Sequence, residues 1–144
     1  MNEKSAEALK IAKQFIDALA RLDAEAQIAL LHDDAVLECP FPVRPGENAP
    51  GSRRQTGPGL RDGLRQSAVN TAEAQFTNCI WRTSDDGLAI LQADGECVMG
   101  NGNPYRNHYV FMFEVAEGKV IRWWEYLNPV VSARAVGMPL EAIP

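Results

Sequence analysis

The stretch NPYRNHYVFMFEVAEGKVIRWWEYLNP, residues 103–129, decides the fold class of this chain. Two runs rich in aromatic and β-branched residues, 103–115 and 119–127, are separated by the short segment 116–118. Such runs predict strands, and the glycine-containing segment between them predicts a tight hairpin turn. Because successive side chains of a strand point to opposite sides, the two faces of each strand can be assigned from the sequence.

One face of the second strand combines apolar residues with a single carboxylate, Glu125. The residues of that face are Ile121, Trp123, Glu125 and Leu127, whereas the other face carries Val120, Arg122, Trp124 and Tyr126. A charge buried without a partner costs free energy or gives up its ionisation. Either this face is exposed to solvent, or Glu125 lies in an apolar environment because its function requires one.

The segments before the hairpin predict three more strands. Residues 76–83 and 88–100 form two long β-prone runs, and the Asp-Asp-Gly sequence at 85–87 predicts the turn between them. A short strand is expected at 35–43, where prolines end it. The last four strands therefore follow one another as a meander.

Three helices are expected ahead of these strands. Apolar residues at steps of three and four predict a helix over 4–21. Asp23 is placed to cap a second helix, which ends near 32–34. The proline- and glycine-rich segment 44–58 is expected to be a mobile loop, and a weaker helix follows over 59–73.

This order of elements favours an α+β fold, with helices packed on one face of an antiparallel sheet. A strongly curved sheet wrapped around a helix layer makes a cone, and its mouth is a natural ligand pocket. The length suits a single domain over 1–144. The tail is expected to begin with one helical turn and then to run irregularly.

Composition narrows the possible partners and cofactors. The net charge is −5 and the most basic run is Arg53–Arg54, so nucleic acid and anionic membrane surfaces are not expected as main partners. No signal-peptide core or membrane-length apolar run is present. Cys39, Cys79 and Cys97 are expected to be reduced, mostly buried thiols of a cytoplasmic protein. No metal-ligand spacing and no phosphate-binding glycine loop occurs, so no metal or cofactor is expected.

Several motifs resemble the nuclear transport factor two-like superfamily: LHDDAVLECP (31–40), TGPGLRDGL (56–64) and the hairpin quoted above. Within it the chain is similar to SnoaL-like and ketosteroid-isomerase-like proteins. The closest resemblance is to phenazine-biosynthesis A/B proteins, on the motifs at 94–96, 105–108, 125–129 and 137–139. The resemblance covers almost the whole chain. It implies a cone-shaped, strongly curved mixed or antiparallel sheet around three N-terminal helices, a cystatin-like α+β barrel, and a homodimer.

The family's catalytic positions transfer only in part. The general base of ketosteroid isomerases falls on Cys39, and their oxyanion-hole tyrosine falls on Phe15. The acid/base glutamate of phenazine-type proteins matches Glu125. Their partner histidine lies on the third helix, where GLRDGLRQS (59–67) contains none. By resemblance, Trp123, Glu125 and Leu127 face the cavity.

Glu125 and Tyr109 are the candidate catalytic residues. In an apolar pocket Glu125 would act as a general acid/base with a raised pKa; the alternative is a half-exposed glutamate or one paired with Arg106. Tyr109 would donate a hydrogen bond to a substrate oxygen, or else be a core tyrosine with its hydroxyl satisfied locally. His108 points to the opposite face, where a partner subunit packs by resemblance.

Eight further residues are candidates for contact with a substrate. Cys39 and Phe15 would form pocket wall, and Asp94 is either a second pocket carboxylate or the mark of a bend in its strand. The tryptophans would stack on a flat ligand or cover a dimer face. The full set is Phe15, Cys39, Trp81, Asp94, Asn107, Phe111, Trp123 and Leu127.

The leading hypothesis is a cofactor-independent acid/base enzyme of the isomerase, cyclase or dehydratase type. Its substrate would be a small hydrophobic cyclic or aromatic carbonyl compound, with Glu125 as proton shuttle. A non-catalytic ligand-binding or assembly protein is the alternative. A third hypothesis is an epoxide or other hydrolase, for which Arg106-Asn107-His108 is a near match that lacks the aspartate.

Overall fold

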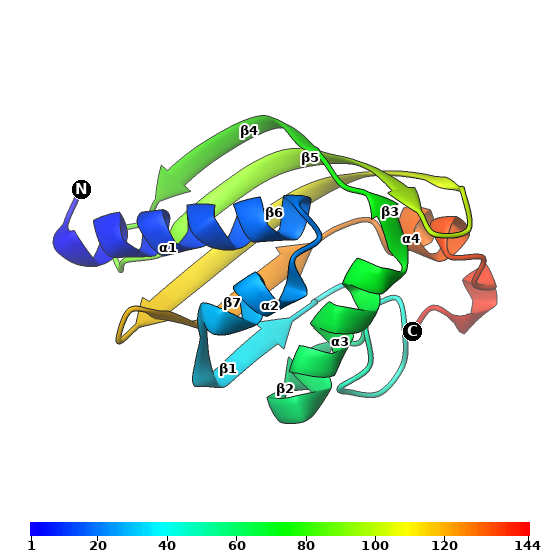
Figure 1. Ribbon diagram of the computed structural model, residues 1–144, viewed down its shortest axis with the longest axis horizontal. Coiled ribbons are helices and arrows are strands. Elements are labelled where there is room, and N and C mark those ends of the chain that lie inside the picture. The colour runs from blue at the N-terminus through cyan, green and yellow to red at the C-terminus, as the bar shows by residue number, and fades with distance from the viewer.

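The first three helices of the chain lie on one face of a seven-stranded sheet in the computed structural model, which describes residues 1–144, and a fourth helix lies at one end of the sheet (Figure 1). The helices are α1 (Glu3–Ala20), α2 (Ala24–Ala29), α3 (Gly57–Val69) and α4 (Pro129–Ala135), followed by a 3₁₀ turn, η1 (Leu140–Ala142). The strands are β1 (Leu31–Glu38), β2 (Arg54–Thr56), β3 (Thr71–Glu73), β4 (Phe76–Thr83), β5 (Ala89–Met99), β6 (Pro104–Ala116) and β7 (Lys119–Tyr126).

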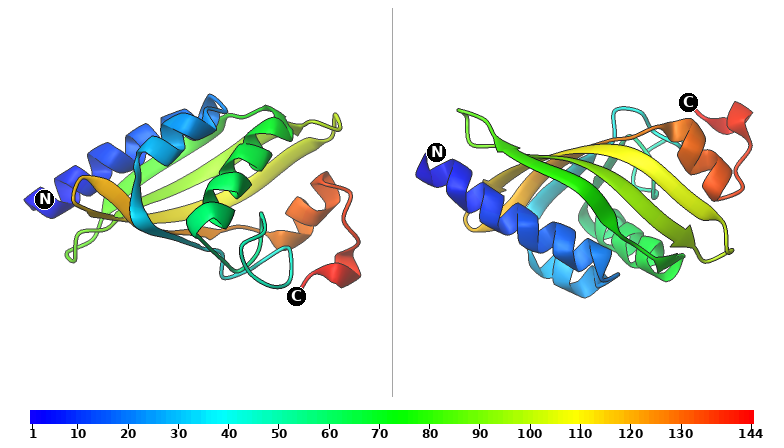
Figure 2. Two further views of the ribbon diagram at one scale, coloured as in Figure 1. Left: turned by 60° about the horizontal axis from the view of Figure 1, so that its bottom comes forward. Right: turned by 90° about the horizontal axis from the view of Figure 1, so that it is seen from above.

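The sheet is mixed, strongly curved and not closed into a barrel. Its strand order is β2-β1-β7-β6-β5-β3, and β4 pairs with another part of β5. Only β1 and β7 run parallel; every other pair is antiparallel. The sheet bends around the helices without its edges meeting (Figure 2). This is the cone-like α+β fold predicted from the sequence, with α4 at one end of the sheet.

Helix α1 supplies the helix side of the core. Asn2 caps it by accepting the Ser5 backbone N–H at 2.7 Å. One stripe of its side chains is buried, and within it Phe15 packs edge-on against Phe113 and Trp123, with ring centroids 5.6 and 5.0 Å apart. The predicted helical stripe therefore meets the predicted apolar strand faces in one hydrophobic core.

The β6–β7 hairpin has the predicted tight turn. Glu117 and Gly118 both have positive φ (55° and 75°), as a type I′ turn requires. The predicted faces of β7 are correct from Arg122 onward and wrong for Val120. Glu114 pairs with Arg122 but Val115 pairs with Val120, so one extra residue is accommodated and the alternation shifts. Val120 is therefore fully buried, although it was assigned to the outer face.

Several element bounds differ from the sequence-based expectation, and the first strand covers Leu31–Glu38 rather than 35–43. The second helix ends at Ala29 rather than near 32–34, because β1 begins at Leu31 in register with Val120 of β7. Strand β2 lies within the expected loop 44–58 and pairs with β1. The third helix ends at Val69, and the segment after it forms β3 on β5. In each case pairing with a distant strand overrides local preference.

The three cysteines differ in their exposure to solvent. Cys39 is buried and Cys97 half-buried, but Cys79 is exposed, so the expectation of mostly buried thiols is wrong for Cys79. None of the helices combines the length and the apolar character that crossing a membrane requires.

Candidate functional site

A cavity of about 510 Å³ lies between the helices and the inner face of the sheet. Its wall is mostly apolar: 19 of the 31 lining residues are hydrophobic. Helices α1, α2, α3 and α4, strands β1, β2, β5, β6 and β7, and the segment after β1 all contribute to it. Its volume and its few polar groups are typical of a small-molecule site.

Glu125 is the only carboxylate in the cavity wall. Strand β7 places it opposite Phe111 of β6. Its one hydrogen-bond partner is Trp123, whose indole Nε1–H donates to Oε1 at 3.2 Å. No lysine or arginine is paired with it, so the predicted alternative of a pair with Arg106 is wrong; Arg106 is exposed. Burial raises the pKa of Glu125, and the Trp123 hydrogen bond opposes part of that rise.

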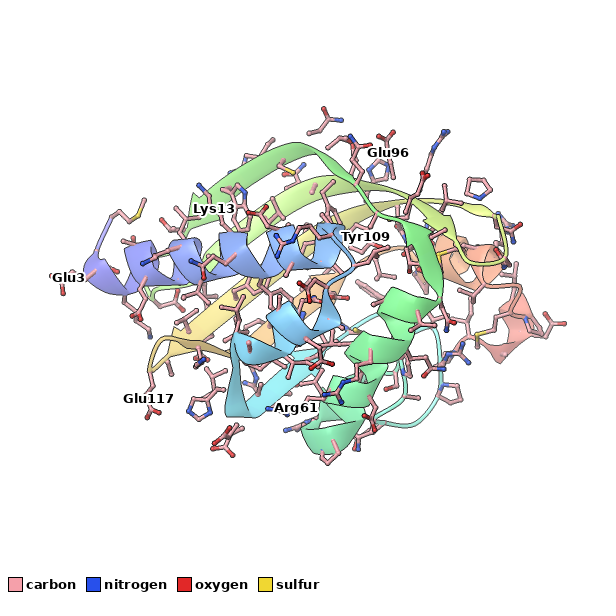
Figure 3. The ribbon with its side chains drawn as sticks, in the orientation of Figure 1. Glu3, Lys13, Arg61, Glu96, Tyr109 and Glu117 are labelled. Carbon is pink, nitrogen blue, oxygen red and sulfur yellow. The ribbon has the colours of Figure 1, made fainter.

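Two tyrosine hydroxyls lie in the same wall. Tyr109 donates to the Tyr105 oxygen at 2.7 Å, and Tyr105 lies 2.7 Å from the Ser132 hydroxyl of α4. Burial is the main cause that raises the pKa of both tyrosines, and the Glu125 carboxylate adds to it. The phenols are therefore neutral hydrogen-bond donors close enough to Glu125 to sense its charge. Figure 3 shows Tyr109 on the helix-covered side of the sheet and Glu96 outside it.

Gly95 of β5 makes room for the Tyr109 ring. A Cβ at Gly95 would lie 2.6 Å from Cε2 of Tyr109. Neither carboxylate of the DGE segment at 94–96 lines the cavity. The role of this segment is to accommodate, at its glycine, the aromatic ring that carries a candidate catalytic hydroxyl. No three His, Cys, Asp or Glu side chains come together as a possible metal site.

Comparison with known proteins is consistent with this geometry. The model of the SnoaL-like domain matches residues 12–123. This chain belongs to the SnoaL-like domain family. The uncharacterised protein YesE of Bacillus subtilis (strain 168) is 29% identical over 138 residues, which are 94% of this chain and 88% of YesE.

Solved structures share the fold of this SnoaL-like chain. A proposed isomerase from Bacillus subtilis superposes with a TM-score of 0.81 and 24% identity, covering 96% of this chain and 98% of that one. A proposed polyketide cyclase from Xanthomonas campestris pv. campestris gives 0.68 and 19%, covering 93% and 99%. Both show the fold alone. The nearer likeness to phenazine-biosynthesis proteins stays a prediction.

The SnoaL-like cavity contains both candidate catalytic residues and three of the eight predicted contact residues, Cys39, Phe111 and Leu127. Burial is the main cause that raises the pKa of the Cys39 thiol, and the nearby Glu125 carboxylate raises it further. A thiol kept neutral in this way forms part of the cavity wall and does not act as a nucleophile.

Four predicted contact residues do not line the cavity because their side chains are used for packing or local bonds. Phe15 and Trp123 are fully buried in the core against each other. Asn107 is buried, and its amide group donates to Tyr105, Ser132 and the Asn128 backbone. Trp81 is half-buried on β4, with the Lys13 amine 6.0 Å from its ring.

Asp94 and His108 lie on the outer face of the sheet and do not contact the cavity. The Asp94 carboxylate bonds to His108 Nδ1 and to Asn78 Nδ2, and these two bonds lower its pKa. The prediction that His108 faces away from the cavity is correct. Arg106 shares that outer face, so the Arg106-Asn107-His108 run does not assemble a hydrolase site.

Sequence reasoning missed several polar cavity residues, among them Tyr105, Ser132, Gln27 and Gln55. Tyr105 was accessible from the sequence, because it lies two residues before Asn107 on the same face of β6. Gln27 also carried a signal, as a polar residue three positions after Ala24 on the buried side of α2. Gln55 and Ser132 gave none, since β2 was not expected and only a single helical turn was expected where α4 forms.

Proposed function

We propose that this SnoaL-like protein is a cofactor-independent acid/base enzyme acting on a small hydrophobic cyclic or aromatic carbonyl compound. The supporting observation is the Glu125 carboxyl, half-buried and without a cationic partner, in the wall of an apolar cavity that also carries two neutral phenols. Its fold neighbours include a proposed isomerase and a proposed polyketide cyclase, which agrees with this class of chemistry.

The proposed reaction needs only these groups. The Glu125 carboxylate removes a proton from the carbon next to the carbonyl, and the electron pair moves onto the carbonyl oxygen. Tyr109 or Tyr105 donates a hydrogen bond to that oxygen as negative charge develops. Glu125 then returns the proton to the same or another carbon, which restores the carbonyl. A raised pKa suits both directions of transfer near neutral pH.

The test uses 1-tetralone in D₂O, with deuterium incorporation at its C2 followed by proton NMR. We expect the wild-type protein to accelerate exchange and Glu125→Gln to lose about 10²-fold or more of that rate, as expected for removal of a general base. Glu96→Gln, at an exposed glutamate outside the cavity, is the matched control and should keep the rate. Exchange that is equally fast in Glu125→Gln would rule out Glu125 as the base.

A non-catalytic ligand-binding protein is the second candidate. It is favoured by one observation: the Tyr109 hydroxyl already donates to Tyr105, so it is satisfied without a substrate. A ligand-binding function predicts no deuterium exchange above the background rate. It also predicts that wild type and Glu125→Gln bind 1-tetralone equally well. The proposal also includes a homodimer and a cytoplasmic location, the latter supported by three free cysteines.

A further inference from the structure

Two buried glutamines face the same cavity as Glu125. Gln27 of α2 is 2% exposed and Gln55 of β2 is 3% exposed, and both belong to the cavity wall. The Gln27 Nε2 atom is shut off from solvent and has no hydrogen-bond acceptor in the protein. It is the only buried side-chain nitrogen or oxygen in the chain left in this state.

The unpartnered amide costs stability. A buried donor without an acceptor loses its hydrogen bonds to water and gains nothing in return, and most buried polar groups therefore have partners. A leucine at position 27 would fill a similar volume without that cost. A ligand oxygen in the cavity would supply the missing acceptor once rotation about the last side-chain bond of Gln27 turns its amide nitrogen toward the cavity.

Local structure directs Gln27 inward. Asp23 caps α2 by accepting the Ala26 backbone N–H at 3.0 Å, which sets where the helix begins. Ala24 and Gln27, three residues apart, are the two buried positions of this helix. The second carboxamide is accommodated in a comparable way, because a Cβ at Gly63 of α3 would lie 2.9 Å from Gln55 Oε1.

The chemistry of the wall selects a neutral ligand. Glu125 and Arg44 are the only charged residues that line the cavity, and Arg44 is exposed. A carboxamide is uncharged and carries both a donor and an acceptor, which rotation about its last side-chain bond exchanges. Helix α2 lies in front of the sheet that carries Glu125 (Figure 1). The cavity thus has polar groups on its sheet side and on its helix side.

We propose that the Gln27 carboxamide, supported by Gln55, binds a second oxygen function of a neutral ligand from the helix side. Glu125 and the tyrosines meet the carbonyl from the sheet side. This inference rests on the proposed function in taking the reacting carbonyl to lie at Glu125. The ligand class is then an uncharged cyclic ketone that carries a hydroxyl or a second carbonyl away from the reacting end.

The test compares 6-hydroxy-1-tetralone with 1-tetralone by isothermal titration calorimetry. We expect Gln27→Leu to weaken binding of the hydroxy ketone about tenfold and to leave binding of 1-tetralone within about twofold. The thermal midpoint of the ligand-free protein should rise, because the unsatisfied donor is gone. Gln14→Leu, the same change at an exposed position of α1, should alter neither quantity.

Three outcomes would overturn the assignment: equal weakening of both ketones, no effect on either, or a lower thermal midpoint for Gln27→Leu. Gln27→Met repeats the test with an unbranched side chain if the leucine variant does not fold. A wild-type protein that binds neither ketone would also overturn it. Glu125→Gln separates the two proposals. If this variant loses deuterium exchange but still binds 6-hydroxy-1-tetralone more tightly than 1-tetralone, both proposals are supported. Unchanged exchange in that variant contradicts only the proposed function.

Discussion

At the scale of single residues, the proton affinity of Glu125 depends on its surroundings. Burial favours the neutral carboxyl, while the Trp123 N–H favours the carboxylate, and burial dominates. The same surroundings keep the Tyr109 phenol and the Cys39 thiol neutral. The cavity therefore contains one carboxyl whose pKa is raised, with neutral hydrogen-bond donors in the same wall.

The raised pKa of Glu125 predicts a pH-dependent gain in stability for Glu125→Gln. At pH below the ordinary carboxyl pKa the group is protonated in both folded and unfolded chains, so it contributes no difference. As the pH rises, the unfolded chain loses its proton first and the wild type loses stability until the pH passes the folded pKa. Each tenfold weakening of the acid corresponds to about 1.4 kcal/mol.

The measurement is urea unfolding of wild type and Glu125→Gln at pH values from 4 to 9. The free energy of unfolding of the variant should exceed that of the wild type by an amount that grows with pH and then levels off. Glu96→Gln should track the wild type throughout, because it is exposed. A constant difference across the range would show that Glu125 is not desolvated.

At the scale of elements, strands β5 and β6 together position the tyrosine hydroxyls of the candidate site. Their unbroken register places Gly95 opposite Asn107, and the Tyr109 ring lies over the glycine. Asn107 then holds Tyr105 from the same strand, and α4 brings Ser132 to it. The Tyr109 ring of β6 can therefore occupy its position only because Gly95 of β5 has no side chain.

Gly95→Ala is expected to displace the Tyr109 ring and to lower the free energy of unfolding by about 1–3 kcal/mol, as overpacking does. The exchange rate of 1-tetralone should fall as well, because the hydroxyl moves with the ring. The control is a double-mutant cycle with Tyr109→Ala. In that background, Gly95→Ala should cause almost no further loss of the free energy of unfolding. An equal cost in both backgrounds would mean that the clash is not with Tyr109.

At the scale of the whole molecule, the outer face of the sheet carries apolar side chains in neighbouring strands. Val110 is 37% exposed and Ile80 44% exposed, and the half-buried Met112 and Trp124 pair across β6 and β7. Apolar side chains gathered on an exposed sheet face mark interaction sites more often than chance. This is the face on which the predicted homodimer would form.

Val110→Glu should convert such a dimer to a monomer, because it would bury two charges in a self-complementary interface. Light scattering coupled to size-exclusion chromatography measures the mass directly. Val69→Glu, at an 82% exposed position at the end of α3, is the matched control and should leave the mass unchanged. A monomeric wild type would refute the dimer, and a dimeric Val110→Glu would place its interface elsewhere.

The sequence alone determined the order of long elements, the cone-like α+β class and the inner faces of β6 and β7 at the site. Local periodicity gives the alternation of side chains within each strand, and the resemblance to SnoaL-like proteins implies which face lines the cavity, so Glu125, Tyr109 and Phe111 could be assigned to it without coordinates. Tertiary structure decided the rest. The shift of alternation before Trp123, the short strands β2 and β3, the packing of Phe15 and the cavity positions of Gln27 and Gln55 depend on pairing between distant segments. Such pairing leaves no periodic signal in a single chain, because its free energy comes from contacts that exist only once the fold has formed.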